Sequence, residues 1–122
     1  MKREPNTTKT GQRAEELAAK WLEEKGWMVL DRNYRFMRSE IDIVAFDQTF
    51  IVFIEVKYRS DSRFGHPEEF ITPDKEKHIR KAAEAWLYER KMEGALTRFD
   101  AIAILKEEAD TPGISHFENV FR

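Results

Sequence analysis

The sequence predicts a single α/β domain in which a mixed β-sheet is flanked by helices, with the elements in the order α-β-β-β-α-β-β. Two segments repeat apolar residues at the spacing of a helix with one buried face, and the segments between and after them are rich in Ile, Val and Phe. The 122 residues suffice for one hydrophobic core but not for two. No internal repeat or long linker divides the chain.

The composition excludes several classes of protein. The 21 Lys and Arg against 23 Asp and Glu give a formal net charge of -2, so nucleic-acid contact would require a local basic patch. The absence of cysteine removes disulfides, thiolate zinc sites and cysteine nucleophiles, and suits a cytoplasmic location. No apolar run approaches the ~18 residues of a membrane span, and residues 1–11 lack the apolar core of a secretory signal. We therefore expect a soluble, cytoplasmic protein with no membrane partner.

The first helix is expected between Gln12 and Lys25, and Gly26 is a good C-terminal stop. Its apolar residues follow the i, i+3, i+4, i+7, i+8 pattern and are Ala14, Leu17, Ala18, Trp21 and Leu22. Residues 1–10 are polar and contain Pro5. We therefore expect a flexible arm over residues 1–10 and one domain over residues 11–122.

Three strands are expected next. A short apolar run over residues 27–30 predicts the first strand, and a polar bend from Asn33 leads to Ser39. The segments 41–46 and 50–56 are rich in Ile, Val and Phe and are separated only by residues 47–49, which predicts a β-hairpin. Both faces of this hairpin carry apolar residues, so the sheet should be covered on both sides.

A second helix is expected over residues 73–92, with Thr72 as its N-cap, Pro73 in its first turn and Gly94 beyond its end. Its predicted buried residues are Ile79, Ala82, Ala83, Trp86 and Leu87. Residues 99–105 predict a further strand, and residues 114–121 predict a last strand at an edge, after a turn over residues 110–113.

Four charged residues interrupt the apolar hairpin, where an unpaired charge costs several kcal/mol. They are Glu40, Asp42, Glu55 and Lys57. Glu55 and Lys57 are two residues apart, so their side chains leave the same face of a strand. If the hairpin closes on a two- or four-residue loop, Asp42 lies opposite Glu55 and Glu40 lies opposite Lys57. A three-residue loop would break this register.

Two opposed carboxylates about 5 Å apart suit a shared divalent cation. Oxygen ligands from Asp42 and Glu55, with the Val56 carbonyl, water and Glu40 as further candidates, are what Mg²⁺ or Mn²⁺ prefers. Lys57 beside such an ion could orient an attacking water and offset charge in a phosphoryl transition state. The alternative without chemistry is a Glu40–Lys57 ladder, with Asp42 and Glu55 at a solvated edge of the sheet.

The arrangement of an Asp, a short hairpin and then Glu-x-Lys resembles the PD-(D/E)xK nuclease superfamily, which includes restriction endonucleases and Holliday-junction resolvases. A wider set of motifs, spread from Gly11 to the last strands, resembles the small YraN-type family of uncharacterised bacterial proteins. These motifs are Gly11-Gln12-Arg13-Ala14-Glu15, Asn33-Tyr34-Arg35, Glu40-Ile41-Asp42, Phe53-Ile54-Glu55-Val56-Lys57-Tyr58-Arg59, Phe64-Gly65 and Arg98-Phe99-Asp100. Ser39 stands where the family pattern has a glycine.

The resemblance implies a restriction-endonuclease-like core and a metal-dependent endonuclease that acts on DNA rather than RNA, with branched or damaged DNA as a candidate substrate. It makes Asp42 and Glu55 metal ligands, Lys57 the catalytic lysine and Glu15 a helix-borne carboxylate that completes the site. It also allows a homodimer, because superfamily members that cut both strands are commonly dimeric. A non-catalytic nucleic-acid-binding module with the same fold is the alternative.

Nucleic-acid binding requires a positively charged surface, and cationic residues occur at two places in the sequence. The expected contacts are Arg35 and Arg59 beside the site, and Lys75, Lys77, Arg80 and Lys81 at the start of the second helix. The N-terminus of this helix adds backbone donors for phosphate. A solvated helical face is the alternative interpretation of the second group.

Overall fold

The computed structural model describes residues 5–59, 70–105 and 113–121, and over them the predicted order of elements is confirmed. The elements are α1 (Pro5–Glu24), β1 (Met28–Phe36), β2 (Ser39–Phe46), β3 (Ile51–Arg59), α2 (Pro73–Glu89), β4 (Thr97–Leu105) and β5 (Gly113–Phe117). Neither of the helices described is long and apolar enough to cross a membrane. The predicted Phe64-Gly65 motif and most of the turn over residues 110–113 lie outside the described residues.

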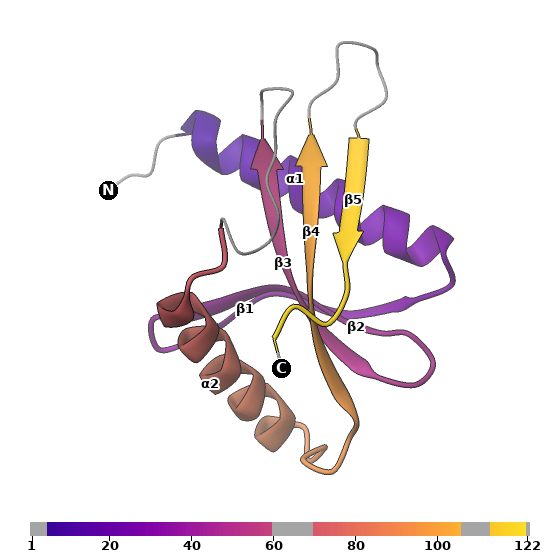
Figure 1. The fold of residues 1–122 in the computed structure, drawn as a ribbon, viewed down its shortest axis with the longest axis vertical. Helices are drawn as coiled ribbons and strands as arrows, with labels where there is room; N and C mark the ends of the chain where they lie inside the picture. The colour runs from indigo at the N-terminus through magenta and orange to yellow at the C-terminus, as the bar shows by residue number, and fades with distance from the viewer. Residues whose placement is uncertain (1–4, 60–69, 106–112, 122) are drawn as a thin grey trace.

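The five strands form one mixed sheet in the order β1-β2-β3-β4-β5 (Figure 1). β3 and β4 are parallel, and α2 lies between them in the sequence, whereas the other neighbours are antiparallel. A parallel pair needs a long crossover, which the helix supplies. The sequence therefore folds into a mixed α/β sheet with the connectivity of a restriction-endonuclease-like core.

Both faces of the sheet are covered, as the apolar residues on both faces of the hairpin predict. α1 packs on one face, and the buried residues of that cluster include Ala18, Leu22, Ile43, Ile54 and Ile102. α2 packs on the other, and the buried residues of that cluster include Ile41, Phe53, Ile79, Ala82 and Trp86. Along β3 the side chains alternate between the two clusters, because successive residues of a strand point to opposite faces.

The start of α2 is fixed by the local interactions that the sequence predicts. Thr72 is the N-cap, and its Oγ1 accepts a hydrogen bond of 3.1 Å from the Lys75 N–H. Pro73 occupies the first turn, where its missing N–H is not needed. The helix ends at Glu89 rather than at residue 92, with Arg90 as the C-cap and Lys91 in the left-handed region at φ 58°.

The boundaries of α1 and β1 differ from the prediction. α1 begins at Pro5 rather than Gln12, because apolar periodicity marks only the part of a helix that is packed and proline is tolerated in a first turn. β1 is one continuous strand over residues 28–36. Its register with β2 shifts between Val29 and Asp31, and Asn33 within it has a left-handed φ of 55°. The predicted bend from residue 33 is therefore wrong.

The β1–β2 turn is instead confined to Met37 and Arg38. Met37, at φ 57°, supplies the left-handed residue. Ser39 is already the first residue of β2, paired with Phe36 and buried. The turn therefore does not require a glycine at position 39.

The C-terminal strands also differ in extent. β4 begins at Thr97, two residues before the prediction, and pairs in register with β3 from Ile51–Thr97 to Arg59–Leu105. β5 ends at Phe117 rather than residue 121. The chain beyond it still docks on the sheet, because the Val120 N–H donates a 2.7 Å hydrogen bond to the Phe99 carbonyl.

We predict that Trp86→Ala lowers the free energy of unfolding by about 3–5 kcal/mol, because it removes a large side chain at the centre of the α2 core. Trp86 is 1% exposed, stacks edge-on against Phe53 and donates a 3.0 Å hydrogen bond from Nε1 to Asp31. Urea denaturation measures the change. Tyr88→Ala, at a residue 73% exposed on the same helix, is the control and should change stability by less than about 0.5 kcal/mol.

Candidate functional site

The predicted hairpin register is confirmed where β2 and β3 pair. The four paired positions run from Phe46–Ile51 to Ile43–Ile54. Asp47 organises the turn, since its Oδ1 accepts hydrogen bonds from the N–H groups of Thr49 (2.9 Å) and Phe50 (2.7 Å). This Asx turn, with Gln48 at φ 87°, replaces the glycine that the loop lacks.

Beyond Ile43 and Ile54 the two strands stop pairing. β2 continues to Ser39 paired only with β1, and β3 continues to Arg59 paired only with β4. The predicted pairs of Asp42 opposite Glu55 and of Glu40 opposite Lys57 are therefore not formed. Glu40 instead pairs with Arg35 across β1, where an Arg35 nitrogen lies 3.7 Å from a Glu40 oxygen. This also excludes the predicted alternative of a Glu40–Lys57 ladder.

Asp42 lies where the strands separate. Its Oδ2 accepts a 2.8 Å hydrogen bond from the Val56 N–H, which the β2 backbone no longer reaches. A side-chain carboxylate thus satisfies an edge N–H that would otherwise lack a partner. Asp42 retains some exposed surface, yet protein atoms surround most of its carboxyl group.

The separation brings carboxylates from three elements together. Along β3, Phe53 packs in the α2 cluster and Ile54 in the α1 cluster. Because side chains alternate along a strand, Glu55 lies on the α2 side, like Phe53. Glu15 projects from α1, which packs on the opposite face. Both side chains are close enough to Asp42 to act on its ionisation. The opening in the sheet is what lets groups from opposite faces meet at one carboxylate.

This crowding changes the ionisation of the carboxyl groups. Burial raises the pKa of Asp42, and the negative charges of Glu55 and Glu15 raise it further, to about 8, although the Val56 N–H opposes the shift. Burial also raises the pKa of Glu15, although hydrogen bonding with Asp42 and Asn33 opposes that shift. Both carboxyl groups therefore favour the protonated form, and a nearby cation would favour the ionised form of each.

One carboxylate oxygen of this cluster lacks a partner among the described residues. Glu15 Oε1 is buried and accepts no hydrogen bond in the part of the chain that the structure describes. Glu55, by contrast, is neutralised: its Oε2 lies 2.6 Å from the Lys75 ammonium at the start of α2. A small pocket beside Glu55, between the sheet and α2, is otherwise lined largely by apolar side chains such as Ile41, Ile79 and Phe99.

The donor atoms suit a hard divalent cation. Asp42, Glu55 and Glu15 offer only carboxylate oxygens, and the buried, unpaired Oε1 of Glu15 lacks the partner that a cation would provide. Within residues 5–59, 70–105 and 113–121, however, no three His, Cys, Asp or Glu side chains are already grouped closely enough to hold an ion. Binding of an ion here would require a side chain to turn inward, and Glu55 is the carboxylate that is already held by a cation, Lys75.

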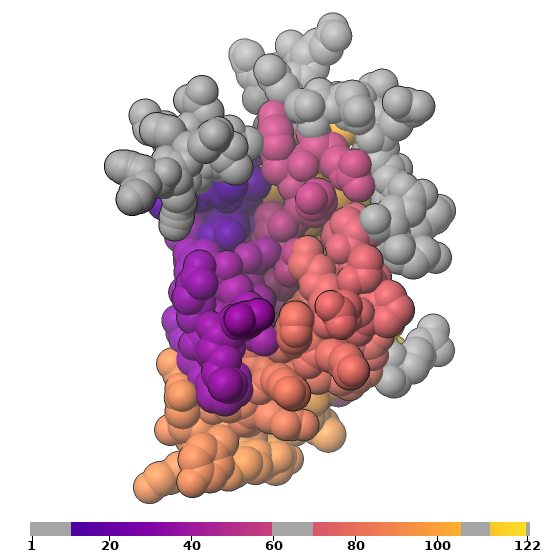
Figure 2. Space-filling model, turned by 90° about the vertical axis from the view of Figure 1, so that its left-hand side faces the viewer, coloured from indigo at the N-terminus to yellow at the C-terminus, as the bar shows by residue number. Residues whose placement is uncertain are grey.

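The predicted nucleic-acid contacts have different surroundings. Lys77 and Lys81 are exposed on α2, and Arg35 is exposed near the β1–β2 turn. Arg80 is engaged, because it forms a 2.9 Å ion pair with Glu76 and lies over the Phe99 and Phe121 rings. Lys75 is held by Glu55. Figure 2 shows a recess between the β1–β2 hairpin, the end of β3 and the start of α2.

Lys57 and Arg59 follow Glu55 on β3, at alternate positions that share its face. Both are half-buried, and the ion pairs found among the described residues do not include Lys57. The Arg59 Nε is buried and has no hydrogen-bond partner in the described part of the chain. Within residues 5–59, 70–105 and 113–121, Lys57 thus shares the face of Glu55, and no acid there forms an ion pair with its ammonium.

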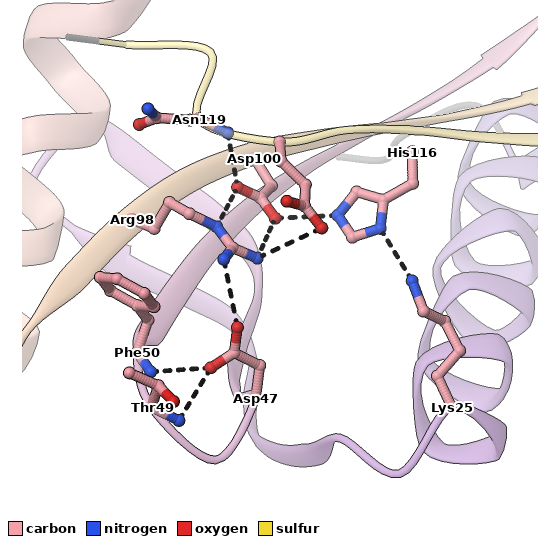
Figure 3. A network of polar contacts seen from close by, with 9 residues as sticks. Lys25, Asp47, Thr49, Phe50, Arg98, Asp100, His116 and Asn119 are labelled. Atoms are coloured by element: carbon pink, nitrogen blue, oxygen red, sulfur yellow. Dashed lines mark hydrogen bonds and ion pairs between the residues drawn. The ribbon is translucent and has the colours of Figure 1, made fainter.

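A second polar cluster, which the sequence left without a role, lies on the α1 face of the sheet (Figure 3). Asp100 is its centre: the side chain is fully buried, Arg98 donates hydrogen bonds of 3.0 and 2.9 Å to it, and His116 Nε2 lies 2.8 Å away. The Asn119 N–H donates another at 2.9 Å. Arg98 also bridges to Asp47 at 3.1 Å, which ties β4 to the hairpin turn.

The chemistry of this second cluster is that of a closed structural network. Burial alone raises the pKa of Asp100, but the hydrogen bonds from His116, Arg98 and Asn119 outweigh it and hold the pKa below its usual range. His116 is enclosed by Trp21 and Trp27 and reaches Lys25 at 3.3 Å. A lysine only donates, so His116 Nδ1 accepts this hydrogen bond and Nε2–H donates to Asp100. Asp100, Arg98 and His116 are thus all engaged in contacts within the network.

Comparison with known proteins agrees with this architecture. The model of the uncharacterised protein family UPF0102 matches residues 14–104, and the chain therefore belongs to UPF0102, the YraN family. A UPF0102 protein of Geotalea daltonii is 42% identical over 117 residues, which are 95% of this chain and 92% of its own. One from Chlorobium limicola is 46% identical over 107 residues, covering 88% and 83% of the two chains. The protein BL0935 of Bifidobacterium longum is 40% identical over 114 residues, 91% of each.

The raised pKa of Asp42 predicts a pH dependence of stability. Asp42 ionises near pH 3.8 when unfolded but near pH 8 when folded, so raising the pH between these values favours the unfolded chain. Asp42→Asn removes this contribution. In EDTA, its stability relative to the wild type should increase from pH 5 to pH 8, by at least about 1 kcal/mol, and then level off. Thermal unfolding of both proteins across this range measures the difference, and parallel curves would contradict the prediction.

The Asp100 network predicts a large loss of stability on Arg98→Met, of about 3–5 kcal/mol, because Asp100 would keep its buried charge without its main cationic partner. Chemical denaturation measures the loss. The matched control is Arg35→Met, which removes an arginine from an exposed ion pair and should change stability by less than about 1 kcal/mol. Similar small effects of both changes would show that Asp100 does not depend on Arg98.

Proposed function

We propose that this protein is a metal-dependent endonuclease that hydrolyses phosphodiester bonds of nucleic acid, DNA in preference to RNA, in the cytoplasm. The observation that carries the proposal is that the charges of Glu15 and Glu55 act on Asp42 where β2 and β3 separate. Asp42 accepts one hydrogen bond from the Val56 N–H and Glu55 is paired with Lys75, whereas Asp100 is surrounded by donors from three residues. The buried Oε1 of Glu15, which has no hydrogen-bond partner among the described residues, and the raised pKa of Asp42 support a ligand-binding role.

The proposed function assigns metal binding to the carboxylates and orientation of the attacking water to Lys57. Asp42 and Glu55 would hold Mg²⁺ or Mn²⁺, with the Val56 carbonyl and Glu15 completing the ligands. When bound, such an ion polarises the phosphoryl oxygen and lowers the pKa of a bound water. Lys57, two residues beyond Glu55 on the same face of β3, orients the attacking water and offsets the charge that develops on the phosphorus oxygens. Glu40 has its own partner in Arg35 and is the least suited of the predicted ligands.

The substrate would approach along the recess beside β3 (Figure 2). Lys77 and Lys81, exposed on α2, and Arg35, exposed near the β1–β2 turn, would contact the phosphate backbone. With a formal net charge of -2, binding rests on these few contacts and should weaken with salt. The resemblance to resolvases favours branched or damaged DNA, and a homodimer would place two such sites on two strands.

The second candidate function is a nucleic-acid-binding module that does not cut. It is favoured by one observation: Glu55 already has a cation partner in Lys75. Such a module would bind in EDTA as well as in Mg²⁺, and the charges of Lys77 and Lys81 would matter to it while Lys57 would not.

The test is cleavage of end-labelled single-stranded, duplex, flap and four-way-junction DNA, and of RNA, in Mg²⁺ or Mn²⁺. Glu55→Gln, Asp42→Asn and Lys57→Met should each reduce the rate about 100-fold or more, since each removes a ligand or a charge that acts in the transition state. Glu84→Gln, an exposed change on α2, is the matched control and should cleave like the wild type.

The outcomes separate the two candidates. Cleavage that is lost in the three site variants and kept in Glu84→Gln establishes the endonuclease. Cleavage that persists in Glu55→Gln points to a contaminating nuclease and rejects the assignment. Binding of the same substrates without cleavage, equally strong in EDTA, establishes the binding module instead.

A further inference from the structure

Lys75 has an unusual place for a residue of an exposed helix start. Its ammonium lies 2.6 Å from Glu55 Oε2, and the Glu55 side chain is only 11% exposed. The contact joins residues twenty positions apart in the sequence and links the start of α2 to the second half of β3. Such a short, partly buried contact is a charge-assisted hydrogen bond rather than a loose surface pair.

The position of Lys75 is fixed by the fold. Its own N–H donates to the Thr72 N-cap at 3.1 Å, so the backbone of Lys75 is locked into the first turn of α2. The helix is in turn held on the sheet by Ile79, Ala82 and Trp86, which are at most 6% exposed. The side chain thus starts from a rigid base beside Glu55, while 40% of it remains exposed.

The charge balance of the cluster depends on this contact. Glu55 adds to the charge that acts on Asp42, whose carboxyl already lies in protein surroundings. Lys75 is the basic residue in direct contact with Glu55 among those the structure describes. Without a cation at this position, the carboxylates would repel one another inside the protein. Lys75 therefore acts as an internal counter-ion.

The Lys75 ammonium, 2.6 Å from Glu55 Oε2, competes with a divalent cation for this carboxylate, because both are attracted to the same negative charge and repel each other. We propose that Lys75 is a positioning residue of this site, which holds Glu55 as a built-in counter-ion and competes with Mg²⁺ or Mn²⁺ for it. The inference rests on the proposed function for the metal, but it makes a separate claim about a residue on α2. It gives Lys75 a role other than the phosphate contact that the sequence predicts.

The competition has a direct consequence for metal affinity. Removing the ammonium while keeping the length of the side chain removes the competitor and leaves Glu55 free to ligate. Lys75→Met should therefore bind Mn²⁺ more tightly than the wild type by about ten- to hundredfold, the range expected for a hydrogen bond to a charged group. A purely structural role for Lys75 would leave the affinity unchanged or lower it.

The experiment measures free Mn²⁺ by electron paramagnetic resonance during titration of the full chain, at constant pH and ionic strength and without nucleic acid. Lys77→Met is the matched control, because it removes the same charge from an exposed position of the same helix. Its affinity should stay within about threefold of the wild type, as expected for a distant, screened charge. Lys75→Arg keeps a cation in place and should also remain close to the wild type. Circular dichroism verifies that each variant is folded.

Each outcome decides between claims. Tighter Mn²⁺ binding in Lys75→Met alone supports the counter-ion. Equal affinities of Lys75→Met and Lys77→Met, or weaker binding in Lys75→Met, overturn it while leaving the metal site in place. If Lys75→Met does not fold, Lys75→Gln takes its place with the same expectation. A wild type and a Lys75→Met variant that both fail to bind Mn²⁺ would overturn the proposed metal site together with the role of Lys75.

Discussion

The candidate site depends on one interruption in the sheet, the loss of pairing between β2 and β3 beyond Ile43 and Ile54. A strand that leaves its neighbour exposes N–H groups that need partners. The carboxylate of Asp42 supplies one, at 2.8 Å from the Val56 nitrogen, and so keeps the two diverging strands connected. The same interruption gives Glu15, from the α1 face, and Glu55, from the α2 face, access to a common point. Continuous pairing would have kept these groups on opposite sides of the sheet.

The polar clusters around Asp100 and Asp42 differ in how the buried carboxyl group is stabilised. At Asp100, one carboxylate is surrounded by donors from Arg98, His116 and Asn119, and the pKa is lowered. Around Asp42, burial and the negative charges of Glu55 and Glu15 outweigh the hydrogen bond from the Val56 N–H, and the pKa is raised. The first arrangement stabilises the junction of β4 with the hairpin turn. The second keeps unfavourable interactions that a cation would relieve, which is typical of sites that bind a ligand or act on one.

The α2 helix connects stability with the candidate chemistry. Its apolar face forms the core around Trp86, while its first turn carries Lys75 to Glu55. The Thr72 cap sets the residue at which α2 begins, and thereby the position of Lys75 in its first turn. The packing of α2 on the sheet therefore also positions the Lys75 ammonium. A change in this packing would alter the contact between Lys75 and Glu55.

The sequence by itself determined what depends on local pattern. The order of elements, the Thr72 cap and the placement of Glu55 and Lys57 on one face follow from apolar periodicity, turn chemistry and the alternation of a strand. The four hairpin pairs followed only for a loop of two or four residues, and the structure decided for that register. Only the tertiary structure decided where β2 and β3 part, that Glu40 turns to Arg35, and that Lys75 and Glu55 meet. These contacts join distant segments, and their formation depends on the packing of both helices against the sheet. No local pattern of residues specifies that packing, which is why the sequence could name the acids of the site but not their partners.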